Sequence, residues 1–161
     1  CERVKVSVFL QKTAELNNLD SQFPVPEYPE GGHSYKFPMN ADRLSDGQID
    51  EWLLFFGAWR GYLTYKIASL DGEQSLLSEG FDVMLSTKIA ELEKQSDKRL
   101  LKDSLKGLAL AEDDQLESLR VRVIGLSAEL KLLKGKLSLY DSQFDTISRV
   151  VTRRGQERFK I

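Results

Sequence analysis

The 161-residue chain is 41% apolar and 30% charged, and its charged fraction exceeds the roughly 25% usual for globular domains. Its formal net charge is −2, but residues 120–161 hold 10 basic and 4 acidic side chains, whereas residues 1–94 hold 9 and 15. The single Cys excludes an internal disulfide, and no apolar run approaches the roughly 20 residues that a membrane span needs. We therefore expect a soluble, cytoplasmic protein (in the host cell if it is viral) whose basic end meets a polyanion or an acidic partner.

Residues 1–44 differ in composition from the rest, and we expect them to form an N-terminal arm. The alternating apolar stretch Val4–Leu10 is compatible with a short strand. All four prolines and the Gly31–Gly32 pair follow, and these residues disfavour helix. The segment 22–44 is therefore expected to be either an extended, ordered loop or a flexible leader.

A first long helix is expected to begin at Ser45. Ser45 and Gln48 have the spacing of a capping box, and Asp46 suits the positive end of the helix dipole. Large apolar residues then recur at spacings of three and four from Ile49 to Met84. This periodicity predicts a helix with one continuous apolar face.

Aromatic residues are dense near the start of this helix, and Trp52, Phe56 and Trp59 share one face. We expect them to lie in the core of a hairpin or between subunits, where buried aromatic rings supply association energy. The alternative is a stacking platform for single-stranded bases, with Tyr62 and Tyr65 as its best candidates.

Four glycines, Gly57, Gly61, Gly72 and Gly80, lie within the same helix, and each costs about 1 kcal/mol relative to Ala. Their position among bulky aromatic residues predicts the close approach of another backbone. A kink at Asp71–Gly72 is the other interpretation.

The periodicity weakens between Lys94 and Asp114. We expect a turn there, with or without a short helix, that reverses the chain. The acidic run Glu112–Asp114 fits the N-terminal cap of a second helix better than a site for a divalent cation. Residues 45–161 are therefore expected to form one domain, a long helical hairpin.

The second helix carries the strongest pattern in the sequence. Apolar residues occupy every a and d position of five consecutive heptads between Leu116 and Val151, which predicts a left-handed coiled coil. Ile124 and Leu139 widen this stripe, so we expect an all-α protein in which hairpins assemble into an oligomer. The residues expected to mediate oligomerisation are Trp52, Phe56, Trp59, Leu126, Leu130, Leu133, Leu137, Tyr140 and Phe144.

Motifs for catalysis or metal binding are absent from the sequence. His33 is the only histidine, and no HExxH, CxxC, Gly-rich phosphate loop or nucleophile elbow occurs. We therefore expect no enzymatic activity, no cofactor and no bound metal.

Basic side chains gather in two groups, one in the middle of the chain and one at its C-terminal end. In the second group, Arg149 and Arg153 are four residues apart and share a helix face. Repeated in an oligomer, such a patch would bind phosphates in a salt-dependent, sequence-independent manner. The alternative is a solvated helix end, which also favours Lys and Arg. The residues expected to contact nucleic acid are Arg149, Arg153, Arg154, Arg158, Lys98, Arg99, Lys102 and Lys106.

The acidic segment Glu112–Leu116 leads into the heptad helix, which closes with Phe144–Arg149. On these features the chain resembles, in a divergent form, the UvsY-type recombination mediators of bacteriophages, over about residues 46–155. It lacks the basic-aromatic Tyr-Tyr-Ser-Gly segment of that family, for which Lys94–Lys106 is the nearest substitute. The proline-rich arm is an addition to the family pattern.

The resemblance implies an oligomer that binds single-stranded DNA and helps to load a RecA-like recombinase. Such a protein acts against a competing single-strand-binding protein and hydrolyses no nucleotide itself. The rival hypothesis is a structural or scaffolding phage protein, a virion or assembly component that binds no DNA. In that case the heptads only join subunits, and the arm at residues 1–44 straps neighbouring subunits together.

Overall fold

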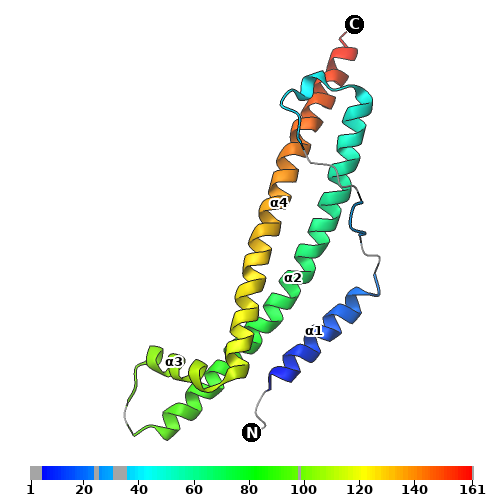
Figure 1. Ribbon diagram of the computed structural model, residues 1–161. Coiled ribbons are helices and arrows are strands. Elements are labelled where there is room, and N and C mark those ends of the chain that lie inside the picture. The colour runs from blue at the N-terminus through cyan, green and yellow to red at the C-terminus, as the bar shows by residue number, and fades with distance from the viewer. Residues whose placement is uncertain (1–4, 24–25, 31–35, 98, 161) are drawn as a thin grey trace. The chain divides into compact units, whose positions relative to one another are not determined.

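A computed structural model describes residues 5–23, 26–30, 36–97 and 99–160 (Figure 1). Its elements are α1 (Val6–Asp20), the short 3-10 helix η1 (Ala41–Arg43), α2 (Asp46–Gln95), α3 (Lys102–Glu112) and α4 (Asp114–Arg158). No strand occurs in these described ranges, which confirms the predicted all-α class. None of the described helices combines the length and the apolar character that crossing a membrane requires.

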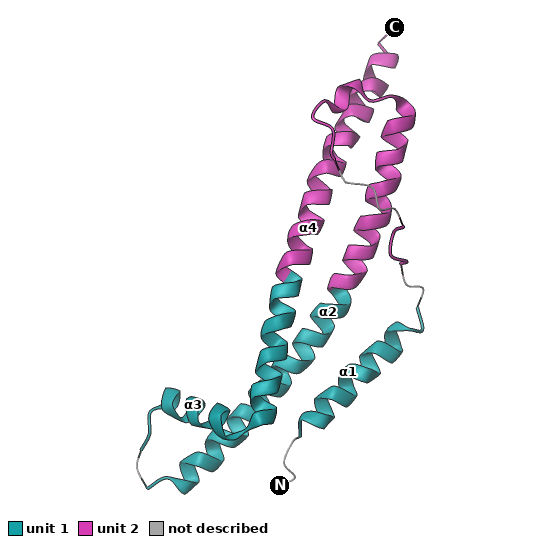
Figure 2. Cartoon of the chain, in the orientation of Figure 1, with its two compact units in different colours: residues 1–24, 68–130 teal, residues 25–67, 131–161 magenta. Residues whose placement is uncertain are grey.

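Contacts group the chain into two compact units, coloured separately in Figure 2. Unit 1 comprises residues 1–24 and 68–130, and unit 2 comprises residues 25–67 and 131–161. Both α2 and α4 contribute one segment to each unit, and the connection between these helices, which includes α3, belongs to unit 1. The predicted domain boundary at residue 44 stays a prediction.

Helix α2 begins where the sequence predicts. The backbone N–H of Gln48 donates to Ser45 Oγ at 3.2 Å, and the Ser45 N–H donates to Gln48 Oε1 at 2.9 Å. These two bonds are the reciprocal capping box, and they satisfy donors that the first turn would otherwise leave unpaired. The helix then runs through Asp71 and Gly72 as part of one element, and the kink considered there stays a prediction.

The strand considered for Val4–Leu10 is wrong, because the described part of that stretch lies in α1. Alternation over a few residues can be compatible with helix as well as strand, and Val6, Phe9 and Leu16 also have helical spacing. Packing on α2 decides between the two. A Cβ built on Gly80 would lie 2.5 Å from the Phe9 ring, and one on Gly72 would lie 3.9 Å from Leu16.

The glycines of α2 therefore differ in what surrounds them. Gly80 admits an aromatic ring of α1, whereas the sequence predicted the approach of another backbone. Gly57 and Gly61 have no neighbouring atom within 4 Å of a built Cβ. Only the glycine that faces Phe9 has a steric reason to lack a side chain.

The core of unit 2 joins the first half of α2 to the second half of α4. Phe56 and Ile147 are fully buried, and the ring of Tyr140, in the same core, lies 6.1 Å from that of Phe56. The segment before α2 contributes as well, since Phe37 and Ala41 join this core. The proline-rich region therefore holds residues that are part of a folded unit.

The core of unit 1 is apolar, and polar contacts outside its fully buried part also join α2 to α4. Gln74 of α2 donates from Nε2 to Ser127 Oγ of α4, and Arg122 donates to Glu73 Oε1 at 2.8 Å. Helix α3, anticipated as an optional short helix, buries Leu105 and Ala109. The buried apolar residues of unit 1 on α2 and α4 are Leu70, Leu77, Met84, Leu92, Leu116, Leu119, Leu126 and Leu130.

Much of the heptad seam of α4 is buried within the chain, but its last residue is exposed there. Val150 is buried with Ile147 and Ala41, whereas the predicted seam residue Val151 is 43% exposed. A straight α-helix has 3.6 residues per turn, so a strict heptad drifts away from the buried face. Val150, one residue before Val151, is the residue that shares the buried core with Ala41.

Candidate nucleic-acid interface

The aromatic residues predicted to mediate oligomerisation pack in the core of unit 2. The rings of Trp52 and Phe56 stack at 5.6 Å, and Trp59 lies 6.3 Å from Tyr140. These rings therefore pack against α4 of the same chain, and their predicted role in oligomerisation stays a prediction. The residues before α2 close the cluster, because Phe37 lies 5.6 Å from Trp52.

A stacking platform for bases would need exposed ring faces on α2, and Tyr62 and Tyr65 are its best candidates. Tyr28 lies edge-on to Tyr62 at 5.3 Å and edge-on to Trp59 at 5.0 Å. Tyr65 is half-buried and also has a partner within the chain. The aromatic rings that a base would stack on therefore already contact other residues of the same chain.

The predicted oligomerisation residues of α4 likewise face their own chain. Leu126 and Leu130 are buried in unit 1, and Tyr140 is buried in unit 2. Leu133, Leu137 and Phe144 are half-buried against the core of unit 2.

An exposed apolar pair on α4 offers another surface for association. Leu132 is 74% exposed, and Leu139, one heptad later on the same face, is 42% exposed. Gly135 lies between them with no atom within 4 Å of a built Cβ. Leu132 was not among the predicted residues, although Leu139 was noted. The heptad positions a and d follow the buried face of α4, and Leu132 lies outside them.

The arginines at the C-terminal end of α4 meet acidic groups at the start of α2. Arg153 contacts Asp42 at 2.5 Å, Arg154 contacts Asp46 at 2.8 Å, and Arg158 contacts Asp46 at 3.1 Å. We call this set of three arginines and two aspartates the arginine clasp. The carboxylates lie more than 100 residues away in sequence, so no local spacing predicts these pairs.

Arg154 is the most firmly held member of the clasp. Its side chain is 25% exposed, and it also donates to the carbonyl oxygens of Asp42, at 3.0 Å, and Leu44. Hydrogen bonds from Arg154, followed by those from Arg158, lower the pKa of Asp46 below its usual 3.8. Arg154 therefore ties the residues before α2 to the end of α4, which is a structural role.

Arg149 lies outside the clasp but beside it. Within the described ranges it takes no part in the ion pairs that hold the other three arginines. It lines a hollow of about 400 Å³ together with Arg153, Asn40 and Thr146. Met39, Ala41, Asp42 and Val150 complete the lining. Two guanidinium groups and a side-chain amide at one hollow can donate several hydrogen bonds to an oxyanion.

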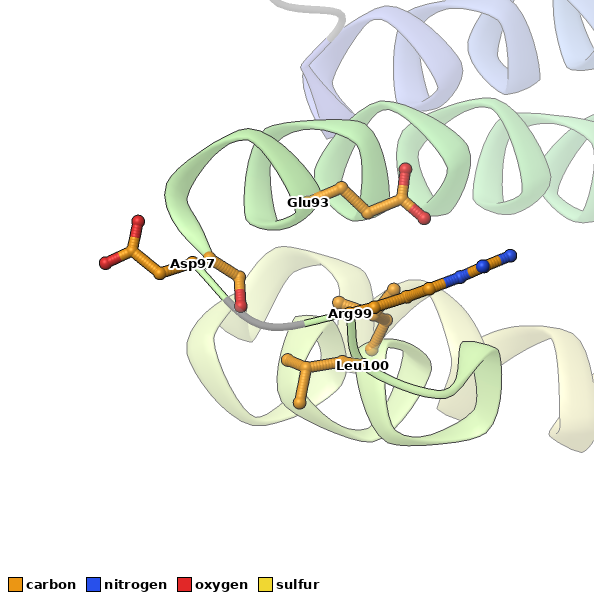
Figure 3. Close-up of a pocket in the computed structure, with 6 residues that line it drawn as sticks. Glu93, Asp97, Arg99 and Leu100 are labelled. Atoms are coloured by element: carbon orange, nitrogen blue, oxygen red, sulfur yellow. The ribbon is translucent and has the colours of Figure 1, made fainter.

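The middle group of basic residues belongs to unit 1, whereas the C-terminal arginines belong to unit 2. Arg99 lines a hollow of about 240 Å³ that also contains Glu93 and Asp97, as Figure 3 shows. Lys102 and Lys106 are exposed and lie one turn apart on α3. Lys98 lies outside the described residues. Figure 3 shows the Asp97 carboxylate directed away from Arg99, so the negative charge of Glu93 is the reason that this hollow suits a phosphate poorly.

The acidic run before α4 is a helix cap, as predicted. Asp113 Oδ1 accepts hydrogen bonds from the backbone N–H groups of Gln115, at 3.0 Å, and Leu116, at 3.2 Å. Glu112 lies 3.5 Å from Lys88 of α2. In the part of the chain that the structure describes, no three His, Cys, Asp or Glu side chains are grouped so that they could hold a metal ion. His33 lies outside the described residues.

Comparisons with protein-family models, curated proteins and solved structures give no match.

Proposed function

We propose that this chain is a self-associating, non-enzymatic helical protein that binds the phosphates of single-stranded DNA at the hollow beside Arg149. The observation that carries the proposal is the placement of Arg149 and Arg153 at one hollow with Asn40. Guanidinium groups bind phosphate oxygens through pairs of hydrogen bonds, without reading the bases. Binding of this kind is independent of sequence and weakens with salt.

In finer terms, we propose a recombination mediator. On this hypothesis the protein helps to load a RecA-like recombinase onto DNA that a single-strand-binding protein also occupies. The proposal rests on the resemblance of Glu112–Leu116 and Phe144–Arg149 to the UvsY-type family, and on the basic C-terminal third of the chain. It requires no cofactor and no nucleotide hydrolysis by this chain.

Self-association is the second part of the proposal, and the exposed pair Leu132 and Leu139 supports it. Large apolar side chains at heptad spacing form a stripe that a second helix can cover. Gly135 between them would allow the partner helix a close approach. An oligomer would also repeat the Arg149 hollow and so add phosphate contacts.

The test is fluorescence anisotropy of a labelled oligonucleotide at two salt concentrations, with light scattering on the same samples. We expect an oligomer that prefers single strands and binds them less tightly at high salt. Arg149→Gln should weaken binding roughly tenfold at low salt, since a hydrogen bond to a charged group is worth about 1.5–3 kcal/mol. It should also reduce the salt slope by about 0.7, the value for one phosphate on a single strand.

Lys66→Gln is the matched control, because Lys66 is an exposed cation of the same unit that lies on α2. It should leave the affinity within a factor of about 2 of the wild type, as expected for a surface charge distant from the DNA. Equal effects of the two substitutions would contradict a phosphate site at Arg149. A joint Arg153 and Arg154 substitution would be a poorer test, because Arg154 has a structural role.

A structural or scaffolding protein is the second candidate, and the arginine clasp favours it. Three of the four C-terminal arginines proposed for DNA already have carboxylate partners. An oligomer that ignores DNA even at low salt would support this candidate and would contradict the DNA-binding proposal.

A further inference from the structure

The arginine clasp contains two kinds of contact, which differ in burial. The Arg154 side chain is 25% exposed and has two backbone carbonyl partners besides Asp46. Arg153 and Asp42 are 54% and 64% exposed, and Asp42 is the acidic partner of Arg153 in the described structure. An exposed ion pair between side chains is weak and exchanges with solvent ions readily. The Arg153–Asp42 pair can therefore open while Arg154 keeps the segment attached.

Arg153 belongs to both the clasp and the hollow. It lines the hollow with Arg149, and Asp42 lines the same hollow. A carboxylate and a phosphate offer a guanidinium the same arrangement of acceptor oxygens. Asp42 therefore occupies donors on Arg153 that a phosphate in the hollow would use, and it adds a negative charge at the point where the phosphate would lie.

We infer that Asp42 is an intramolecular competitor of single-stranded DNA: its carboxylate must leave Arg153 before a phosphate can be held by Arg149 and Arg153 together. This inference rests on the proposed function and adds a regulatory element to the same site. Any process that neutralises or moves Asp42 strengthens binding. The competitor is carried by η1, the three-residue helix Ala41–Arg43, directly before the capping box of α2.

The test compares oligonucleotide affinity for the wild type, Asp42→Asn and Arg153→Gln, and for the variant that carries both substitutions. Asn has nearly the shape of Asp but no charge, so Asp42→Asn should bind roughly 1.5- to 5-fold more tightly at low salt, the range expected from an exposed ion pair. In the Arg153→Gln background the same change should bring a smaller gain, because Asp42 then has no guanidinium to occupy.

Glu51→Gln is the matched control, since it removes a negative charge from an exposed position on α2 of the same unit. Its affinity should stay near that of the wild type. Unfolding temperatures of all variants are measured in parallel, and an Asp42→Asn variant that is folded yet binds no more tightly than Glu51→Gln overturns the competition. An equal gain in both Arg153 backgrounds also overturns it, because the effect would then be one of general charge.

Failure of the competition and failure of the proposed function are distinguishable. If the wild type binds DNA and Asp42→Asn brings no gain, only the competition is wrong. If neither the wild type nor Asp42→Asn binds DNA at low salt, both proposals are wrong.

Discussion

Asp46 shows how single residues hold the two ends of unit 2 together. It lies in the first turn of α2, where a carboxylate also suits the helix dipole, and it accepts hydrogen bonds from Arg154 and Arg158. These arginines lower its pKa, so the folded state favours the charged form. Stability and pH are therefore linked through this residue.

The sign of this linkage gives a prediction. A carboxyl whose pKa falls on folding stabilises the protein at pH values above its unfolded pKa, here 3.8, and this contribution is lost as the pH falls below it. Asp46→Asn should therefore lower the unfolding temperature at pH 7, and the difference from the wild type should shrink progressively as the pH falls below 3.8 and through the lower pKa of the folded state. Thermal unfolding followed by circular dichroism at several pH values measures this.

Glu51→Gln is again the control for the loss of one exposed carboxylate on α2. A difference between Asp46→Asn and the wild type that stays the same size across this acidic range would contradict the linkage.

The residue scale also shows which contacts a sequence can reveal. The Ser45 and Gln48 cap involves residues three apart, so its spacing is visible in the sequence and was predicted correctly. The Arg154 and Asp46 contact joins residues 108 positions apart. Such a pair depends on where the helices lie. The sequence indicates only that residues 1–94 are acidic overall and residues 120–161 are basic.

At the scale of elements, α1 is the clearest case in which tertiary contacts decide the structure. None of its residues is fully buried, and its described contacts with α2 include Phe9 at Gly80 and Leu16 at Gly72. The local pattern of Val4–Leu10 suggested a strand, whereas the structure has a helix from Val6 onward. The open space at Gly80 lets the Phe9 ring lie against α2 and thereby favours the helical spacing.

This contact predicts opposite effects of one substitution at two glycines of α2. Gly80→Ala should release or shift α1, because its Cβ would lie 2.5 Å from the Phe9 ring. Gly57→Ala meets open space and should stabilise the protein by about 1 kcal/mol through helix propensity. Hydrogen exchange over residues 6–20 reports on α1, and denaturant unfolding reports on stability.

A second variant separates a steric clash from a general effect at Gly80. Adding Phe9→Ala to Gly80→Ala removes the ring and should make the two changes non-additive. Faster exchange of α1 in Gly57→Ala, or unchanged exchange in Gly80→Ala, would argue against the proposed contact.

At the scale of the whole molecule, the heptad helix α4 has one apolar face that is buried within the chain and a second apolar patch that is exposed. Its buried stripe packs inside the chain, for example at Leu126 in unit 1 and Tyr140 in unit 2. The exposed residues Leu132 and Leu139 are the surface that we propose for self-association. A heptad pattern alone does not say whether the partner helix belongs to the same chain or to another.

The prediction at this scale concerns mass in solution. Replacing Leu132 and Leu139 together by Gln should lower the molar mass measured by light scattering toward that of one 18.3 kDa chain. Their exposure means that the unfolding temperature of the chain itself should change little. A matched Leu54→Gln substitution on α2, also exposed, should leave the mass unchanged. An unchanged mass in the double variant would place any interface elsewhere.

The sequence by itself determined the helical class, the start of α2, the cap of α4 and most of the buried stripe of α4. Helix periodicity and caps are local properties, encoded by residues a few positions apart. Only the tertiary structure decided that Trp52, Phe56 and Trp59 pack against α4 of the same chain, that Phe9 fits against Gly80, and that the C-terminal arginines meet Asp42 and Asp46. These contacts join distant residues, and they form because the hairpin brings two helix faces together, which no local spacing specifies.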